Sequence, residues 1–161
     1  MALGDITTFA GDVIVNAANS RMRGGGGVDG AIHRAAGPAL LREERARYPH
    51  GLQVGQAAWT SAGDLPCRWI IHVVGPNRHQ GQTDPDLLAS CYREALKVAD
   101  SLGATTVAFP LVSAGAYGWD VDDATRIAVG AVRITSTQVR EVTMYAFSTQ
   151  VETVLRAALV R

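Results

Sequence analysis

Four consecutive glycines, residues 24–27, stand directly before Val28, Asp29 and a segment with helical periodicity. Glycine loses more backbone entropy on folding than any other residue, so such a run is unfavourable inside a helix or a strand. Without Cβ atoms, however, the chain can lay its N–H groups against a ligand, and the positive end of the following helix adds to their effect. A flexible linker is the alternative, but the run contains no Ser or Pro and lies between a buried strand and a helix. We therefore interpret it as a loop that binds a ligand through its backbone.

Asp29 is the residue of this region best suited to acid–base chemistry. It falls in the first turn of the predicted helix, whose N-terminus favours the ionised carboxylate and so suits it to accept a proton or a hydrogen bond. An acidic residue at such a position is also common for structural reasons alone, because it complements the helix dipole. The glycine run beside Asp29 favours the functional interpretation.

A second loop with the composition of a binding loop covers residues 113–118, Ser-Ala-Gly-Ala-Tyr-Gly. It follows a predicted buried strand and precedes a predicted helix, the setting in which small residues expose backbone N–H groups to phosphates. The loop lacks the lysine of a P-loop, so a Walker-type nucleotide triphosphatase is not supported.

Two asparagines lie near the glycine run. Asn19 carries both a donor and an acceptor, so its side chain can bind a hydroxyl group without adding charge. The alternative is a side chain that caps the turn between the strand and the loop. Asn16, which is closer to the strand, fits that alternative better, and we take Asn19 as the candidate ligand residue.

Short apolar runs alternate with segments of helical periodicity through most of the chain. Asp84 and Asp120 are predicted N-caps. This alternation is typical of a mainly parallel sheet with helices on both faces, in which ligands bind beyond the carboxyl ends of the strands. Both candidate loops follow predicted strands, so we expect them to meet at that edge. The predicted strands are 12–16, 56–60, 69–74, 105–109 and 141–147, and the predicted helices are 28–47 in two pieces, 84–103, 120–132 and 151–159.

Composition places the chain among ordinary globular proteins. Its 161 residues, 47% hydrophobic and 19% charged, are enough for one domain with a true core. The formal net charge is zero, so bulk electrostatics do not indicate affinity for nucleic acid or an acidic membrane, although a local anion site remains open. Cys67 and Cys91 have no paired ligand spacing, so we expect buried thiols rather than a disulfide or a zinc site.

Five segments match the sequence pattern of one known family in order: Gly4–Thr7, the Asn19 motif, Gly24–His33, Ile71–Pro76 and Phe109–Gly118. The chain resembles macrodomains over nearly its whole length, and the aspartate within the glycine run resembles the MacroD-type subgroup. The resemblance implies a single macrodomain over residues 1–161, folded as a three-layer α/β/α sandwich with a mixed, mostly parallel sheet.

The resemblance also implies an activity. Macrodomains of this type bind ADP-ribose, remove mono-ADP-ribose from acidic side chains and deacetylate O-acetyl-ADP-ribose, with neither a metal nor an organic cofactor. A water would lie between a phosphate oxygen and Asp29. Two alternatives remain: a module that holds ADP-ribose without hydrolysing it, and a hydrolase of ADP-ribose on nucleic-acid phosphates. The expected partners are therefore ADP-ribose, ADP-ribosylated proteins, O-acetyl-ADP-ribose and, as an alternative, nucleic-acid conjugates.

Site residues follow from the resemblance position by position. Asp29 and Asn19 would be catalytic at the distal ribose, and Asp5 would accept a hydrogen bond from the adenine amino group. Tyr117 either covers the ribose or packs under its turn, and Phe147 either stacks on the adenine or belongs to the core. Asp12 and Val13 are expected to line the site. The full expected ligand set is Asp5, Ile6, Asn19, Gly24, Gly25, Gly26, Gly27, Val28, Asp29, Ser113, Ala114, Gly115, Ala116, Tyr117 and Phe147. His33 and His72 are expected to be structural rather than metal ligands.

The N-terminal residues lack the basic and apolar regions of a secretory signal, and no apolar run is long enough to span a membrane. We therefore expect a cytoplasmic protein, and the preference for arginine over lysine suggests a bacterial gene. The resemblance places a first strand before Gly4, where only a very short segment stands.

Overall fold

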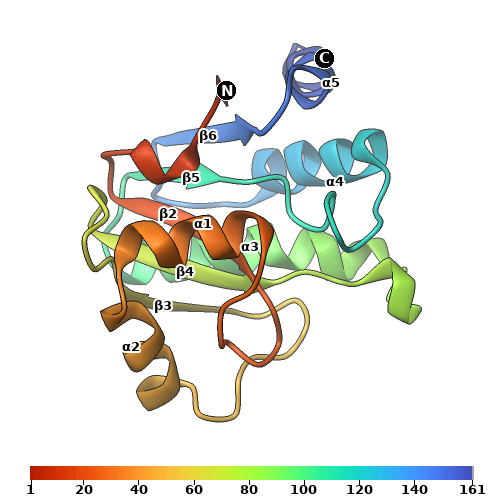
Figure 1. Ribbon diagram of the computed structural model, residues 1–161. Helices are drawn as coiled ribbons and strands as arrows, with labels where there is room; N and C mark the ends of the chain where they lie inside the picture. Colours follow the sequence, from red (N-terminus) through yellow and green to blue (C-terminus); the bar gives the residue numbers. More distant parts are fainter. Residues whose placement is uncertain (161) are drawn as a thin grey trace.

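The computed structural model describes residues 1–160. It is a sheet of six strands between two helical layers, the predicted α/β/α sandwich (Figure 1). The strands are β1 (Ala2–Leu3), β2 (Val13–Ala18), β3 (Ala57–Ser61), β4 (Trp69–Val74), β5 (Thr106–Phe109) and β6 (Glu141–Ala146). The helices are α1 (Gly27–Ala36), α2 (Ala39–Arg47), α3 (Pro85–Ser101), α4 (Val121–Ile134) and α5 (Thr149–Leu159), with 3₁₀ turns at Ile6–Thr8 and Arg78–Gln80.

The strand order is β1-β6-β5-β2-β4-β3. Every neighbouring pair is parallel except β3 with β4, so the prediction of a mixed, mostly parallel sheet is confirmed. β2 is central: the chain leaves it through α1 toward β4 on one side and later returns through α3 to β5 on the other. Such a reversal of direction leaves a crevice at the carboxyl ends of the central strands.

Side chains of β2 alternate between the two hydrophobic cores because successive residues of a strand face opposite sides of the sheet. Val13 and Val15 pack into the core beneath α3 and α4, while Ile14 packs into the core beneath α1 and α2. Asn16 is therefore on the α1 side, fully buried. The expectation that Asn16 caps a turn is wrong, because β2 continues to Ala18.

Local capping signals in the sequence are confirmed. The side chains of Asp84 and Asp120 accept hydrogen bonds from backbone amides in the first turns of α3 and α4. The short first strand expected before Gly4 is present as β1, which pairs with β6. Both cysteines are buried free thiols. Among the helices of residues 1–160, none has the length and apolar character that crossing a bilayer requires.

Candidate functional site

A cleft of about 680 Å³ opens at the carboxyl ends of β2, β4, β5 and β6, within the size range of small-molecule sites. The structure brings both glycine-containing loops to it, as the position of the loops after strands predicts. The lining residues are Gly4, Asp5, Ile6, Ala17, Ala18, Asn19, Gly25, Gly26, Gly27, Val28, Asp29, Ala31, Gly75, Pro110, Leu111, Val112, Ser113, Gly115, Ala116, Tyr117, Tyr145 and Phe147.

The first wall of the cleft is the glycine run and the start of α1. Gly26 is the N-cap residue and supplies no side chain to the helix end. The amides of residues 27–29 have no partner in the helix because they belong to its first turn, and these residues line the cleft, where their amides are available to a ligand. Gly24 and Gly27 have φ values of +83° and +58°, a backbone region that favours glycine.

Gly30 allows this loop to fold back onto α1. A Cβ at Gly30 would lie 2.6 Å from the carbonyl oxygen of Gly25, a contact that requires the backbone to move. We expect Gly30→Ala to lower the free energy of unfolding by about 1–3 kcal/mol through this collision, measured by urea denaturation. Gly130→Ala is the matched control, because a Cβ there meets no atom within 4 Å in the exposed middle of α4. It is expected to stabilise the protein by about 0.5–1 kcal/mol, and equal losses in the two variants would contradict the assignment.

The second wall is the loop after β5. Ser113 has a φ of +66°, which is unusual for a residue with a side chain, and the loop closes with hydrogen bonds from the amides of Gly118 to Gly115 and of Trp119 to Ser113. The amides of residues 114–117 donate to no acceptor within the described residues. Ser113 is 7% exposed, and its Oγ also lacks a partner there. These donors are available to a ligand that carries anionic oxygens.

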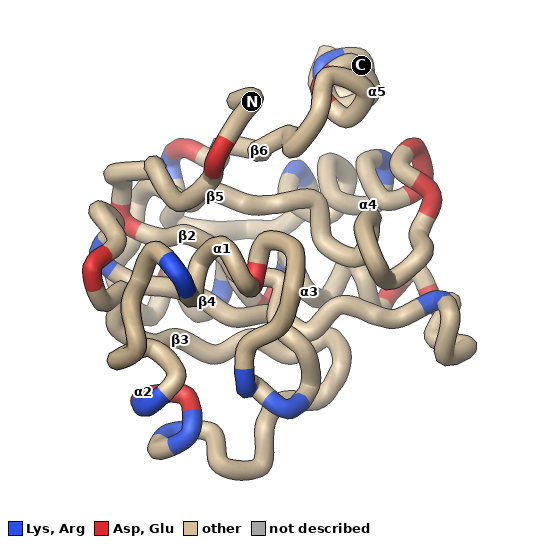
Figure 2. The backbone as a smooth tube through the Cα atoms, viewed as in Figure 1, with Lys and Arg blue, Asp and Glu red and all other residues tan. Residues whose placement is uncertain are grey.

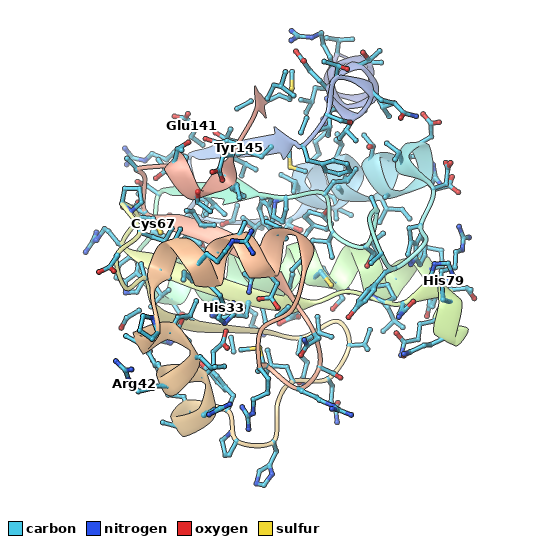
Figure 3. All side chains as sticks on the ribbon, viewed as in Figure 1. His33, Arg42, Cys67, His79, Glu141 and Tyr145 are labelled. Carbon is cyan, nitrogen blue, oxygen red and sulfur yellow. The ribbon has the colours of Figure 1, made fainter. Side chains whose placement is uncertain are left out.

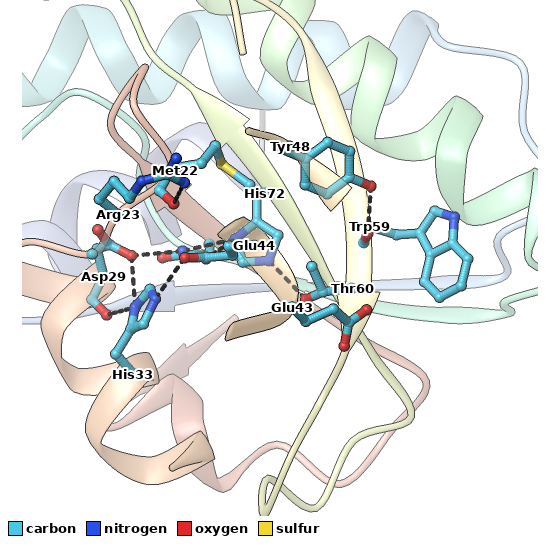
Figure 4. A network of polar contacts seen from close by, with 12 residues as sticks. Met22, Arg23, Asp29, His33, Glu43, Glu44, Tyr48, Trp59, Thr60 and His72 are labelled. Atoms are coloured by element: carbon cyan, nitrogen blue, oxygen red, sulfur yellow. Dashed lines mark hydrogen bonds and ion pairs between the residues drawn. The ribbon is translucent and has the colours of Figure 1, made fainter. Parts of the chain in front are cut away.

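Asp29 lies between the two walls and is 4% exposed. Its Oδ1 accepts a hydrogen bond of 2.8 Å from Asn16 Nδ2 and lies 3.1 Å from His33 Nδ1, one turn along α1 (Figure 4). Its Oδ2 has no hydrogen bond from the described residues and faces the glycine loop, 3.3 Å from where a Cβ of Gly25 would stand. One oxygen is thus held by the protein, and the other is available.

His33 connects Asp29 to a second buried carboxylate. Its Nε2 lies 3.0 Å from Glu44 Oε2, and Glu44 on α2 is 1% exposed. The hydrogen bonds with Asp29 and then with Glu44 raise the pKa of His33 to about 10, so its ring carries both N–H groups at neutral pH. The imidazolium therefore offsets the charge of the two carboxylates and fixes the orientation of Asp29.

His72 closes the back of this network as a neutral ring. It is fully buried, its Nδ1 is 3.0 Å from Asn16 Nδ2, and its Nε2 is 2.8 Å from Thr60 Oγ1. Burial lowers the pKa of His72 to about 3, so its 3.4 Å approach to Glu44 is not an ion pair at neutral pH. Asn16 can then donate to both Asp29 and His72, and the predicted structural role of the two histidines agrees with this packing.

The two histidines give opposite pH dependences of stability. The unfolded pKa of both is near 6.5. The raised pKa of His33 contributes stability that is present below pH 6.5 and is lost as the pH rises toward 10. The lowered pKa of His72 has the opposite effect, because it makes folding less favourable as the pH falls from 6.5 toward 3.

We therefore expect the contribution of this pair to be largest near pH 6.5, measured by urea denaturation between pH 4 and 10. His33→Gln is expected to remove the part of the alkaline decline that His33 causes. An alkaline slope that is unchanged in this variant would contradict the assignment.

The far end of the cleft is lined by residues near β1 and β6. The carboxylate of Asp5 accepts hydrogen bonds from the Thr7 hydroxyl and amide, which lower its pKa. Ile6 is buried beside it. Phe147 is 64% exposed at the end of β6, so the alternative of a core phenylalanine is wrong. Figure 3 shows Tyr145 on β6, at this end of the cleft, and His33 on α1.

Asn19 combines a hydrogen-bonding role in the turn with a position in the cleft, and its binding of a ligand stays a prediction. Its Nδ2 donates to the carbonyl of Gly24, and its Oδ1 accepts from the amide of Arg21, so the side chain does shape the turn. It also lines the cleft beside Gly25. Tyr117 lines the cleft half-buried, and burial raises the pKa of its hydroxyl.

Four expected residues are not brought to the cleft. Gly24 turns toward the ring of His33, and Ala114 packs against the hydrophobic core. Val13 is wholly buried in that core at the opposite end of β2. Asp12 lies at the same amino edge, where its carboxylate accepts hydrogen bonds from the amides of residues 105 and 106, so its function is to join β2 to β5.

Sequence reasoning missed Ala17, Ala18, Gly75, Tyr145 and the buried Asn16 and Glu44. The small residues follow from which strand ends meet at the cleft, and that depends on strand order. Asn16 carried a signal, since a polar residue in an apolar strand must find a partner. Within residues 1–160, no group of three or more His, Cys, Asp or Glu side chains is arranged to hold a metal ion.

The fold and the cleft define an α/β/α sandwich with a ligand-sized crevice at the carboxyl edge of its sheet. The model of the Macro domain family matches residues 15–128. A macro domain-containing protein of Streptomyces nogalater is 57% identical over 150 residues, 91% of this chain and 83% of that protein. One of Streptomyces coelicolor is 56% identical over 148 residues, 89% of this chain and 88% of that protein. The chain belongs to the macro domain family.

Solved structures agree with this assignment. The Oceanobacillus iheyensis macrodomain with ADP has a TM-score of 0.91 and 39% identity, covering 98% of this chain and 87% of that one. The Trypanosoma brucei macrodomain in complex with ADP-ribose has a TM-score of 0.90 and 39% identity, covering 98% of this chain and 67% of that one. The predicted family and fold are confirmed.

Proposed function

We propose that this chain binds ADP-ribose in the cleft and hydrolyses the ester that joins the distal ribose to an acidic side chain, as a MacroD-type enzyme. O-acetyl-ADP-ribose, which carries the same kind of ester, would be a second substrate. The single observation that carries the proposal is the arrangement around Asp29, whose one free oxygen faces a loop of unpaired backbone amides. The related macrodomains solved with ADP and with ADP-ribose support the choice of ligand.

Each part of ADP-ribose would lie against a different region of the cleft. The pyrophosphate would lie between the amides of residues 27–29 on one wall and those of residues 115–117 on the other. The adenine would reach the end lined by Asp5 and Phe147, where the carboxylate can accept from the amino group and the exposed ring can stack. The distal ribose would then lie beside Asn19 and Asp29.

Hydrolysis requires a water near the distal ribose linkage. Asp29 Oδ2 would orient that water together with a phosphate oxygen of the substrate. It would accept a proton from the water as the water oxygen attacks the distal ribose linkage. The ester bond breaks, leaving ADP-ribose with a free hydroxyl and the carboxylate of the target, and the proton passes to solvent. Asn16 and His33 hold Asp29 so that this oxygen stays aimed at the cleft.

The test uses the pure protein and a substrate that carries mono-ADP-ribose on glutamate, with free ADP-ribose followed by chromatography. Release of ADP-ribose is expected, and release of acetate from O-acetyl-ADP-ribose should accompany it. Tight binding of ADP-ribose without release would make the protein a binding module instead. Absence of both binding and release would overturn the proposal.

A further inference from the structure

Charge is distributed unevenly although the net charge is zero. Within residues 21–50 there are six of the chain's 15 basic residues: Arg21, Arg23, Arg34, Arg42, Arg45 and Arg47. The acidic residues of the same segment are Asp29, Glu43 and Glu44, and two of them are buried. Figure 2 shows basic residues on α1, α2 and the loop in front of them, and acidic residues at the start of α4.

Part of this basic region borders a second hollow of about 520 Å³. Its lining consists of Ser20, Arg21, Arg23, Pro49, His50 and Leu52. We call these residues, together with Arg45, an exposed residue of α2 four positions before Pro49 in the chain, the basic rim. The hollow is held in shape by hydrogen bonds from the amide of Leu52 to Ser20 and from Arg23 to the carbonyl of Pro49. Gly51 is needed there, because a Cβ would collide with the Ser20 carbonyl.

The rim adjoins the catalytic end of the cleft. Residues 20–23 lie in the chain between Asn19 and Gly25, which both line the cleft near Asp29. The adenine end, in contrast, lies toward the edge of the sheet that β1 and β6 form. Whatever is attached to the distal ribose would therefore leave the cleft toward the rim.

Several rim cations have no acidic partner. Arg21 and Arg45 are exposed, and neither forms an ion pair or side-chain hydrogen bond within residues 1–160. Unpaired guanidinium groups bind carboxylates through two parallel hydrogen bonds. No exposed Phe, Tyr or Trp lies among the rim residues, whereas surfaces that bind single-stranded nucleic acid combine cations with stacking aromatic rings.

We propose that the basic rim docks the polypeptide that carries the ADP-ribose and selects targets whose modified glutamate is flanked by further acidic residues. This inference rests on the proposed function, because it assigns the target attached to the distal ribose. The rim acts through charge complementarity, which favours encounter and weakens as salt screens it.

The experiment uses two peptides with mono-ADP-ribose on the same glutamate, one flanked by Asp and Glu and the other by Asn and Gln. At low salt the acidic peptide is expected to have a KM lower by about 5-fold at similar kcat, with the advantage lost in 0.5 M NaCl. The double variant Arg21→Ser/Arg45→Ser should lose the preference and keep its activity on the neutral peptide. The control Lys97→Ser/Arg140→Ser removes two exposed cations outside the rim and should keep the preference.

A binding readout separates this inference from the proposed function. Dissociation constants for both peptides are measured by fluorescence anisotropy with the Asp29→Asn variant, so that the measurement does not depend on hydrolysis. Binding of free ADP-ribose is measured separately by calorimetry. Equal affinity for the two peptides, with normal ADP-ribose binding, would overturn the inference alone. The variant lacking the rim arginines could instead lose affinity for an oligonucleotide with ADP-ribose on its terminal phosphate, while the protein shows no preference between the peptides. That result would overturn peptide docking in favour of nucleic-acid docking. If the wild-type protein did not bind free ADP-ribose, the proposed function itself would be overturned.

Discussion

Asp29→Asn is expected to lower kcat for release of glutamate-linked ADP-ribose by about 10²- to 10⁴-fold, the usual contribution of a positioned acid–base group. The amide keeps the shape of the carboxylate but cannot accept the proton of the attacking water. Affinity for free ADP-ribose should change by less than about 3-fold, since the backbone amides that would bind the pyrophosphate are unaltered. Single-turnover release of ADP-ribose and calorimetry measure the two quantities separately.

The control for Asp29 is an acidic residue at a similar helical position without a place in the cleft. Asp122 lies in the first turn of α4, exposed to solvent. Asp122→Asn removes a similar favourable interaction with a helix dipole, so it should leave kcat unchanged. If Asp29→Asn keeps more than about a tenth of the wild-type kcat, Asp29 is not the proton acceptor, since general base catalysis contributes at least 10²-fold.

Glu44→Ala is expected to produce the largest loss of stability. Glu44 is buried and ion-paired with His33, which is in turn paired with Asp29. Glu44→Ala leaves the His33 imidazolium with Asp29 as its remaining carboxylate partner, and breaking a buried pair costs about 3–5 kcal/mol. Urea denaturation at pH 7 should show this loss. The alkaline decline in stability should also be smaller and end at a lower pH, because His33 loses one of the two carboxylates that raise its pKa.

Glu43 offers a neighbouring control on the same helix. It pairs with Arg47 and accepts a hydrogen bond from the amide of Ser61, at a partly exposed position. Glu43→Ala should therefore cost only about 1 kcal/mol or less. Similar losses for Glu43→Ala and Glu44→Ala would mean that burial of the Glu44 pair does not have the energetic importance assigned to it.

The fold could be predicted from local sequence features. Apolar runs such as Ile70–Val74, the capping residues Asp84 and Asp120, and glycines at loops each act over a few residues, so the sequence displays them directly. The alternation of strands and helices then restricts the sheet to a mainly parallel one. The position of the cleft follows as well, because ligand sites of such sheets lie at their carboxyl edge.

The network behind Asp29 could not be predicted in the same way. Asn16, His33, Glu44 and His72 come from β2, α1, α2 and β4, and their contacts depend on how these elements pack. In the sequence, Glu44 resembles any acidic residue of an exposed helix, next to Glu43 and Arg45. Asp12 illustrates the opposite error: its proximity to the Asn19 motif in the chain does not place it in the cleft, since a strand of six residues separates the two ends.

Isothermal titration calorimetry with free ADP-ribose tests the central claim most directly, because the claim requires a preformed pocket for the whole ligand. Saturable binding with a stoichiometry near one is expected for both the wild type and Asp29→Asn. No measurable heat and no thermal stabilisation at millimolar ADP-ribose would contradict it.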